Sequence, residues 1–486
     1  PYLVADLESG RLTDEEAYRY IHSLWTMIEN RRTTVNGRII VGGKGRKHPK
    51  EADVFLHIAM KVAKNCRYVE PQFTLRFDKE TSEEIWDEAL DALGAGATYP
   101  TLYNDDVNVP AVMYGMRVDE KTAEQYVPFG CTEFVIQGQS TGTPNICINL
   151  LKLLTIYMND GIDPIDGKRK SGPVPLKKLE EYQTFEEFYD GYKALLDYYL
   201  DLSVKAQYHS YEVMNQHVSF LFTSLLTDDC IARGKALLDG GVRYLGGTNE
   251  TYGNINTSDS LWVIRDLVFN QKKYTLRQLN DAMLANFNGY EALRKDCLNC
   301  DKYGNDLETA DTMANDLYEF VAKGVRNRGI AIGMQYFLIV ISNNQLNTEW
   351  GNRTAASPDG RLSCMYMNPA NNPQGGANKS GPTAMLNSLA KFDAKYHGGS
   401  VQNIKFSPSM FNENRAVIKS LFKTYFAKGG CHLMVTVVDK GVLEDAVEHP
   451  ENYPDLIVRV SGFSAVFVDL SPNIQQELLS RVLYDK

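Results

Sequence analysis

The chain has 486 residues, of which 43% are hydrophobic and 23% charged, and its formal net charge is −10 at pH 7. This composition is typical of a large globular protein and excludes a disordered or fibrous chain. The densest basic stretch, "GGKGRKHPK" at 42–50, is short and lacks interleaved aromatic residues, so nucleic acid is not an expected partner. No apolar run approaches the length of a membrane-spanning helix, so an integral membrane protein is not expected.

Helical patterns dominate the chain. Thr13 and Glu16 have the spacing of a capping box, and the apolar residues that follow predict an amphipathic helix over 12–30. The same periodicity predicts further helices. They cover 51–64, 82–93, 119–126, 185–205, 213–238, 277–296, 308–327 and 472–484.

Short extended segments lie between these helices. They cover 72–77, 111–116, 133–138, 403–407, 432–438 and 456–462. Strands separated by helices and long loops indicate an α/β fold. A stretch rich in Asn, Pro and Gly at 348–382 is the best candidate for a boundary between subdomains.

The cysteines and histidines do not predict a metal centre. Eight cysteines are spread thinly through the chain, which indicates reduced thiols and a cytoplasmic location. The only close pair, Cys297 and Cys300, is better explained as two thiols at the end of a helix than as a metal or redox motif. No two of the eight histidines have the spacing of metal ligands, so no metal site is predicted.

Near the C-terminus, Gly462 interrupts a segment that alternates like a buried strand, "RVSGFSA" at 459–465. Taken alone, such a glycine indicates a bulge, a close approach of another backbone, or a turn with positive φ. The whole stretch, however, resembles the signature of the glycyl radical enzymes, the family that includes pyruvate formate-lyase and the diol and amine eliminases. The resemblance implies that Gly462 carries a stored Cα radical, delocalised between its flanking amide groups.

The resemblance also implies a cysteine that exchanges a hydrogen atom with this radical. Cys131 fits, in "VPFGCTEFVIQGQSTGTPN" at 127–145, directly after Gly130 and two residues before Glu133. By resemblance, Cys131 forms the thiyl radical that attacks the substrate, and Glu133 is the general base. On their residue types alone, a buried inert thiol and a solvated loop carboxylate are the alternatives.

Further stretches follow the family's order and spacing. They are 102–112, 298–306, 357–361, 381–393, 405–411 and 429–440. Two differences matter. Pyruvate formate-lyase has two adjacent cysteines where this chain has Gly130 and Cys131, and the eliminases have Gly-Cys-Val-Glu-Pro where this chain has Gly-Cys-Thr-Glu-Phe. No known subclass is therefore assigned.

The resemblance sets the expectations for the whole chain. It implies a ten-stranded barrel of two five-stranded halves surrounded by helices, here incomplete at the N-terminus, with a barrel domain at 1–365 and a glycine radical domain at 366–486. It implies an anaerobic, cytoplasmic homodimer that acts on a small-molecule substrate. No cofactor is expected to be bound, because a separate radical S-adenosylmethionine, iron–sulfur activase installs the radical.

We expect the reaction to be an elimination, by a dehydratase or a C–N or C–X lyase. Arylacetate decarboxylation and C–C cleavage of the formate acetyltransferase type are alternatives within the family. A non-catalytic scaffold of the same fold is the alternative from another class, and the presence of both Cys131 and Gly462 argues against it.

Overall fold

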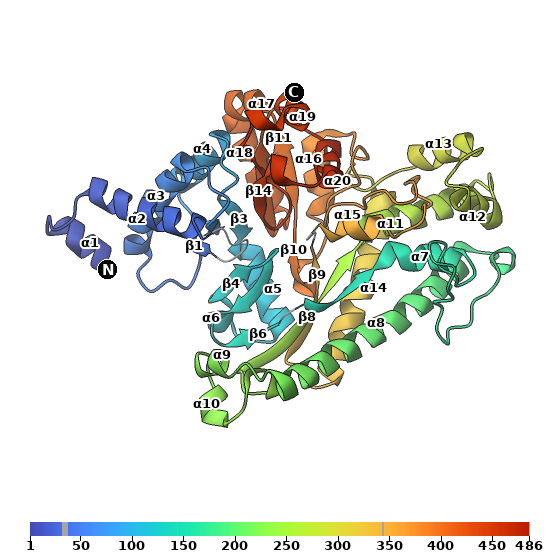
Figure 1. Cartoon of the computed structure of the whole chain (residues 1–486), viewed down its shortest axis with the longest axis horizontal. Coiled ribbons are helices and arrows are strands. Elements are labelled where there is room, and N and C mark those ends of the chain that lie inside the picture. The colour runs from blue at the N-terminus through green and yellow to red at the C-terminus, as the bar shows by residue number, and fades with distance from the viewer. Residues whose placement is uncertain (32–36, 143, 343–344, 486) are drawn as a thin grey trace. The chain divides into compact units, whose positions relative to one another are not determined.

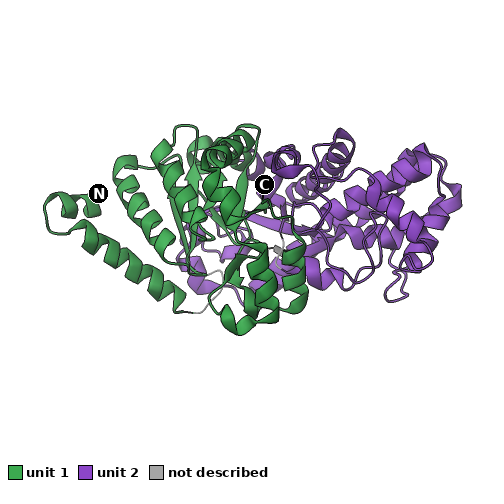
Figure 2. Ribbon diagram, turned by 90° about the horizontal axis from the view of Figure 1, so that it is seen from above, with its two compact units in different colours: residues 1–113, 118–134, 401–486 green, residues 114–117, 135–400 purple. Residues whose placement is uncertain are grey.

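The computed structural model describes residues 1–31, 37–142, 144–342 and 345–485 (Figure 1). The chain forms two compact units, which Figure 2 colours separately. Unit 1 comprises residues 1–113, 118–134 and 401–486, and unit 2 comprises residues 114–117 and 135–400. Each unit contains one five-stranded sheet.

The sheet of unit 1 has the order β1-β2-β3-β12-β11. Its strands are β1 (Arg38–Gly42), β2 (Gln72–Phe77), β3 (Thr101–Asn104), β12 (His432–Val437) and β11 (Asn403–Phe406). Neighbours are parallel except β3 and β12, which are antiparallel. All residues of β2, β3 and β11 are buried, as expected for strands covered on both faces.

Helices and two small hairpins complete unit 1. The helices are α1 (Tyr2–Glu8), α2 (Asp14–Glu29), α3 (Pro49–Asn65), α4 (Glu83–Gly94), most of α5 (Asp105–Met116), α6 (Glu120–Ala123), α17 (Pro408–Glu413), α18 (Arg415–Ala427), α19 (Lys440–Glu448) and α20 (Pro472–Ser480). One hairpin pairs β4 (Tyr126–Phe129) with β5 (Glu133–Ile136), and the other pairs β13 (Ile457–Arg459) with β14 (Ser464–Val466). The capping box of Thr13 and Glu16 opens α2 as predicted.

Unit 2 is built on a parallel sheet. It has the order β10-β9-β8-β6, with β7 also paired to β8. The strands are β6 (Ser140–Thr141), β7 (Pro144–Asn149), β8 (Tyr244–Tyr252), β9 (Tyr336–Ile341) and β10 (His397–Ser400). The helix α14 packs against β9 and against α8 and α11.

The remaining helices of unit 2 lie around this sheet. They are α7 (Leu150–Met158), α8 (Phe185–His217), α9 (Leu221–Leu225), α10 (Cys230–Arg233), α11 (Asn254–Val263), α12 (Leu276–Leu284), α13 (Glu291–Asn299), α14 (Glu308–Ala331), α15 (Leu346–Gly351) and α16 (Gly381–Leu389). In the described part of the chain, no helix combines the length and the apolar character needed to cross a membrane.

The two five-stranded sheets confirm the predicted α/β fold with two five-stranded halves. The stretch 348–382 lies inside unit 2, and the compact units exchange chain at other points, the last of them after Ser400. The division into domains at residue 365 stays a prediction.

Three predicted elements were wrong. The segment 111–116 belongs to α5 and is not a strand. The α5 residues Val109, Val112 and Met116 are buried at helical spacing, but a short apolar run does not by itself distinguish a buried helix from a strand. The predicted helix at 213–238 is also absent, because α8 continues to His217 and two short helices follow. The predicted helix at 277–296 is instead two helices, α12 and α13.

Candidate active site

The cysteine loop, residues 130–132, connects β4 to β5 in unit 1. The amide of Thr132 donates to the carbonyl of Phe129 at 3.1 Å, which closes a tight turn. Gly130 has φ +54° and Thr132 has φ +104°. Positive φ is ordinary for glycine, but for the β-branched Thr132 it costs on the order of 1–3 kcal/mol. The loop is therefore strained and needs support from its surroundings.

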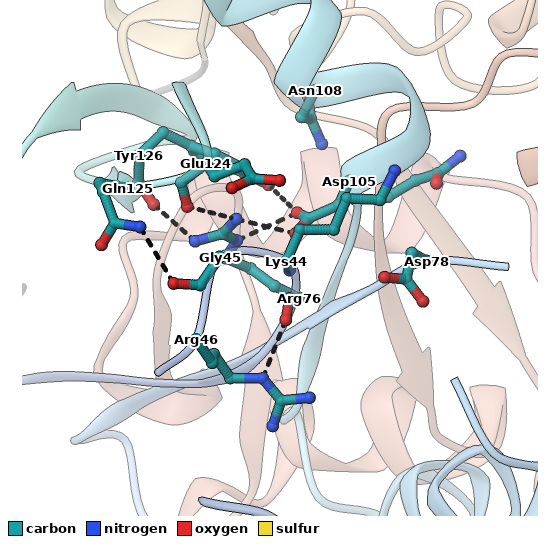
Figure 3. A network of polar contacts seen from close by, with 12 residues as sticks. Lys44, Gly45, Arg46, Arg76, Asp78, Asp105, Asn108, Glu124, Gln125 and Tyr126 are labelled. Atoms are coloured by element: carbon teal, nitrogen blue, oxygen red, sulfur yellow. Dashed lines mark hydrogen bonds and ion pairs between the residues drawn. The ribbon is translucent and has the colours of Figure 1, made fainter. Parts of the chain in front are cut away.

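A buried polar network in unit 1 supplies that support to the strand before the loop (Figure 3). Arg76 on β2 and Asp105 at the start of α5 form a bidentate ion pair, with Nε–Oδ1 at 3.0 Å and Nη2–Oδ2 at 2.8 Å. The Tyr126 hydroxyl donates to Asp105 Oδ1 at 2.7 Å, and Arg76 Nη1 donates to the Tyr126 carbonyl at 2.9 Å. Tyr126 is the first residue of β4, so the network fixes the strand that leads to Cys131.

The glycine loop, residues 460–463, connects β13 to β14. The amides of Val460 and Ser461 both donate to the Phe463 carbonyl, at 3.0 and 3.3 Å. Val460 belongs to an apolar cluster with residues of β13, α19 and α20, including Val458, Leu443 and Leu478. The apolar sequence around Gly462 is explained by this packing.

Two arginines bind the carbonyl groups of the glycine loop. Buried Arg459 donates from Nη2 to the Gly462 carbonyl at 3.0 Å and from Nε to the Ser461 carbonyl at 2.9 Å. Arg481, just after α20, donates from Nη2 to the Val460 carbonyl at 2.6 Å and is itself paired with Glu477 at 2.7 Å. These charge-assisted bonds hold three consecutive carbonyl groups in place.

Gly462 lies directly against Cys131. A methyl group added at Gly462 would lie 2.3 Å from the Cys131 Cα and 2.9 Å from its Sγ, too close for any real side chain. Because a carbon–carbon single bond is about 1.5 Å long, the sulfur lies within about 4.4 Å of the Gly462 α-carbon. Gly462 is not among the residues with positive φ, so close approach, and not turn geometry, requires glycine here.

Glu133 is buried and its carboxylate turns back over the cysteine loop. A methyl group added at Gly130 would lie 2.6 Å from Glu133 Oε2 and 3.2 Å from Oε1. Arg38 on β1 donates from Nη2 to the Gly130 carbonyl at 2.8 Å and also bonds the side chain of Gln72. Glu133 is 3% exposed, so the solvated-carboxylate alternative is wrong.

Residues that the sequence did not single out surround the two loops. Tyr103 on β3 is 3% exposed, and its ring contacts that of His432 at 4.6 Å between centroids. Burial raises the pKa of Tyr103 to about 12, while the charges of Arg38 and Arg459 lower it and that of Glu133 raises it. The Tyr103 hydroxyl therefore stays protonated at neutral pH. Its burial beside both arginines could not be read from the sequence.

One group of possible metal ligands occurs among the described residues, and it contains no residue of either loop. It consists of His57, Glu84 and Glu88 on α3 and α4, whose ligand atoms lie within 4.8 Å of one another. A hydrogen bond of 2.8 Å between His57 Nδ1 and Glu88, two partly exposed side chains, accounts for this arrangement as a contact between the two helices. Cys297 lies in the last turn of α13 and Cys300 follows it, and burial raises the pKa of their thiols to about 12 and 11.

Comparison with known families agrees with this geometry. A family model described as "Pyruvate formate lyase-like" matches residues 1–346, and one described as "Glycine radical" matches residues 367–468. The chain belongs to the glycyl radical enzyme family. The glycine-radical match includes Gly462 and the pyruvate formate lyase-like match includes Cys131.

Curated relatives and solved structures of this family cover nearly the whole chain. The chain is 28% identical over 498 residues to trans-4-hydroxy-L-proline dehydratase of Clostridioides difficile, covering 99% of this chain and 63% of that protein. It is 27% identical over 507 residues to (2S)-3-sulfopropanediol dehydratase of Klebsiella oxytoca, covering 99% of this chain and 61% of that protein. A structure concerned with 1,2-propanediol dehydration in Roseburia inulinivorans superposes with a TM-score of 0.90 at 29% identity, covering 99% of this chain and 63% of that one. The chain thus spans less than two thirds of the length of these relatives.

Proposed function

We propose that this chain carries the radical machinery of a glycyl radical lyase that eliminates a small group, most simply water, from a small molecule. Gly462 stores the radical, Cys131 transfers it, and Glu133 is the base. The observation that supports this best is the close approach of Cys131 to Gly462, because Cys131 occupies the space that a side chain at Gly462 would need. The dehydratases among the relatives support elimination as the reaction.

In the proposed cycle, the Gly462 α-carbon radical takes the hydrogen atom of the Cys131 thiol, which regenerates the glycine and leaves a thiyl radical. The thiyl takes a hydrogen atom from a substrate C–H bond, which restores the thiol and moves the radical to the substrate. Because thiol S–H and glycyl Cα–H bonds are similar in strength, the first exchange is nearly balanced. The later elimination draws the substrate step forward.

Glu133 then accepts the proton of a hydroxyl group on the radical carbon. The resulting ketyl radical anion expels the β leaving group, which takes up the proton that Glu133 accepted, and the product radical recovers a hydrogen atom from the Cys131 thiol. The thiyl formed in this last step takes the hydrogen from Gly462 and closes the cycle. The position of Glu133 supports its role as a base, because its buried carboxylate lies against the loop that carries the reacting thiol.

The surroundings of the two loops suit a reaction that water and oxygen would quench. Cys131 is 4% exposed and Ser461 is 0% exposed. The arginines donate to the carbonyl groups of the glycine loop and do not come between the Gly462 α-carbon and the Cys131 sulfur, which lie within about 4.4 Å of each other. The protein's contribution is thus to hold the two atoms together in a buried position.

Activation and assembly are part of the proposal. A separate radical S-adenosylmethionine, iron–sulfur enzyme would install the radical at Gly462, so the chain itself needs no bound cofactor. Homodimerisation and a cytoplasmic location follow from the family resemblance and stay predictions.

Electron paramagnetic resonance tests the proposal. The protein is incubated anaerobically with an activase, S-adenosylmethionine and a reductant. We expect a doublet from the remaining α-hydrogen of Gly462, and oxygen exposure should cleave the chain at that residue. A radical signal that persists in Gly462→Ala would contradict the assignment.

A substrate screen follows from a positive result. Diols, amino alcohols, hydroxyprolines and arylacetates are incubated with the activated enzyme, and product formation is followed by mass spectrometry. Elimination products support the proposal, whereas carbon dioxide released from arylacetates would assign the chain to decarboxylation.

A further inference from the structure

A second polar site lies entirely within unit 2. It is a cavity of about 390 Å³ between α13, the loop around "SPDGR" at 357–361, and the glycine-rich loop at 374–379. This volume is within the range of small-molecule sites. None of its lining residues belongs to the cysteine or glycine loop.

Four cationic side chains line this cavity: Arg294, Lys302, Arg361 and Lys379. Among the ion pairs of the described residues, none involves any of the four. Two carboxylates, Asp259 and Asp359, also line the cavity, but the four cations outnumber them. The excess of positive charge makes the cavity electropositive.

The four cations differ in how far the fold already uses them. Arg361 donates to the carbonyl groups of Thr354, Ala355, Leu362 and Met365, so it holds its own loop together. Lys302 donates to the carbonyls of Cys297 and Cys300 at the end of α13. Both side chains thus hold backbone segments in place, and their positive charges also attract an anion in the cavity.

Arg294 and Lys379 have donors to spare. Arg294 uses only Nε, which donates to the Gly360 carbonyl at 2.9 Å. In the described part of the chain, its Nη groups and the ammonium of exposed Lys379 form no hydrogen bond. These two side chains are free to bind an anion.

Two buried oxygen atoms at the cavity lack hydrogen-bond donors. Asp259 on α11 is 1% exposed; its Oδ1 accepts from the Tyr303 amide, but its Oδ2 has no hydrogen-bond partner among the described residues. The Oε1 atom of Gln374 is also buried and also has no hydrogen-bond partner among the described residues. Burial raises the pKa of Asp259 to about 7, so desolvation is only partly offset by Lys302. Buried polar atoms of this kind require a partner, so a hydroxyl donor fits here.

From this arrangement we propose that the cavity binds a small hydroxylated organic anion. Its phosphate or carboxylate group is bound by Arg294 and Lys379, in the field of Lys302 and Arg361. One of its hydroxyl groups donates to Asp259 Oδ2 and a second donates to Gln374 Oε1. Leu298, Leu362 and Met365 contact the carbon skeleton. The site does not depend on the radical chemistry proposed above.

Isothermal titration calorimetry on the unactivated full chain tests this site. The probes are glycerol 3-phosphate, glycerate and inorganic phosphate, with glycerol as the uncharged control. We expect saturable binding of a hydroxylated anion, weaker binding of inorganic phosphate, and no binding of glycerol. The tighter of the two organic probes identifies the anionic group.

Matched variants decide where the anion binds. Lys379→Gln and Arg294→Gln should each weaken binding by about tenfold, the range expected for loss of a hydrogen bond to a charged group. The control is Lys295→Gln, because Lys295 is exposed on α13 beside Arg294 but does not line the cavity. This variant should bind the anion as tightly as the wild type. Because Lys379 is exposed, its variant should unfold at the wild-type temperature. Absence of saturable binding, or equal weakening by Lys295→Gln, would overturn the proposal.

Discussion

The cysteine loop and the glycine loop reach the same point of unit 1 by different means. The cysteine loop has positive φ at Gly130 and Thr132, and a buried ion pair fixes the strand before it. The glycine loop has no positive φ, and arginines hold its carbonyl groups. A strained backbone supported by a buried ion pair therefore positions the thiol. Hydrogen bonds from arginine side chains to carbonyl groups position the glycine. Substitution of the residues that support the cysteine loop should therefore lower the free energy of unfolding more than substitution of the arginines that hold the glycine loop.

Removal of the Cys131 thiol should have the largest effect, because it stops turnover without removing the radical site at Gly462. Cys131→Ala should retain the radical on Gly462 but lose turnover by about 10⁴-fold or more, because the storage site is intact and the reactive thiol is absent. Radical content is measured by spin quantitation and turnover by product formation on the same sample. If Cys131→Ala turns over substrate, the thiyl step is wrong.

Glu133→Gln should lower kcat by about 10²–10⁴-fold while the radical signal is unchanged, because a general base is removed without a change of shape. The control is Gln125→Glu, a change of the opposite charge outside the loop, near Gly45. Wild-type kcat in Glu133→Gln would refute the base assignment.

The support of the cysteine loop should be costly to break. Arg76→Met leaves Asp105 buried at 0% exposure without its charge partner, which should lower the free energy of unfolding by about 3–5 kcal/mol. Lys44→Met removes a partner of Asp106 in a pair whose side chains are 31% and 33% exposed, and should cost less than about 1 kcal/mol. Chemical denaturation measures both. Equal losses would show that the network does not support the loop.

The glycine loop should be more tolerant. Arg459→Lys keeps the charge but cannot bond the Ser461 and Gly462 carbonyls together, so we expect a loss of about 1–3 kcal/mol and faster amide exchange at 460–463. The comparison variant is Arg415→Lys, whose ion pair with Asp91 lies on the surface of α18. If exchange at 460–463 is unchanged, Arg459 does not hold the loop.

A shallow pH dependence should come from Lys405 on β11. Burial lowers the pKa of this ammonium to about 8 from 10.5, although it donates to the Leu478 carbonyl of α20 at 3.0 Å. At a pH between these two pKa values, Lys405 is protonated in the unfolded chain and mostly deprotonated in the folded one. The unfolded chain then binds more protons, so the free energy of unfolding should rise with pH. Lys405→Met should remove that slope, and an unchanged slope would show that Lys405 is not its source.

The sequence predicted the parts of this molecule that depend on local patterns. The α2 capping box and the strand at 72–77 have short-range signatures, and the structure confirms both. The roles of Gly462, Cys131 and Glu133 stay predictions. Contacts between distant segments were not predictable: Arg38, Tyr103 and Arg481 come from three separate parts of the chain and meet the loops only in the fold. Segment 111–116 failed because an apolar run of that length suits either a helix or a strand.

The most direct test is solvent deuterium exchange at Gly462. If the Cys131 sulfur exchanges hydrogen with the Gly462 α-carbon, activated enzyme in D₂O should lose its doublet and give a singlet, because the thiol hydrogen exchanges with solvent. In Cys131→Ala the doublet should persist in D₂O. Collapse of the doublet in both proteins, or in neither, would contradict the pairing of these two residues.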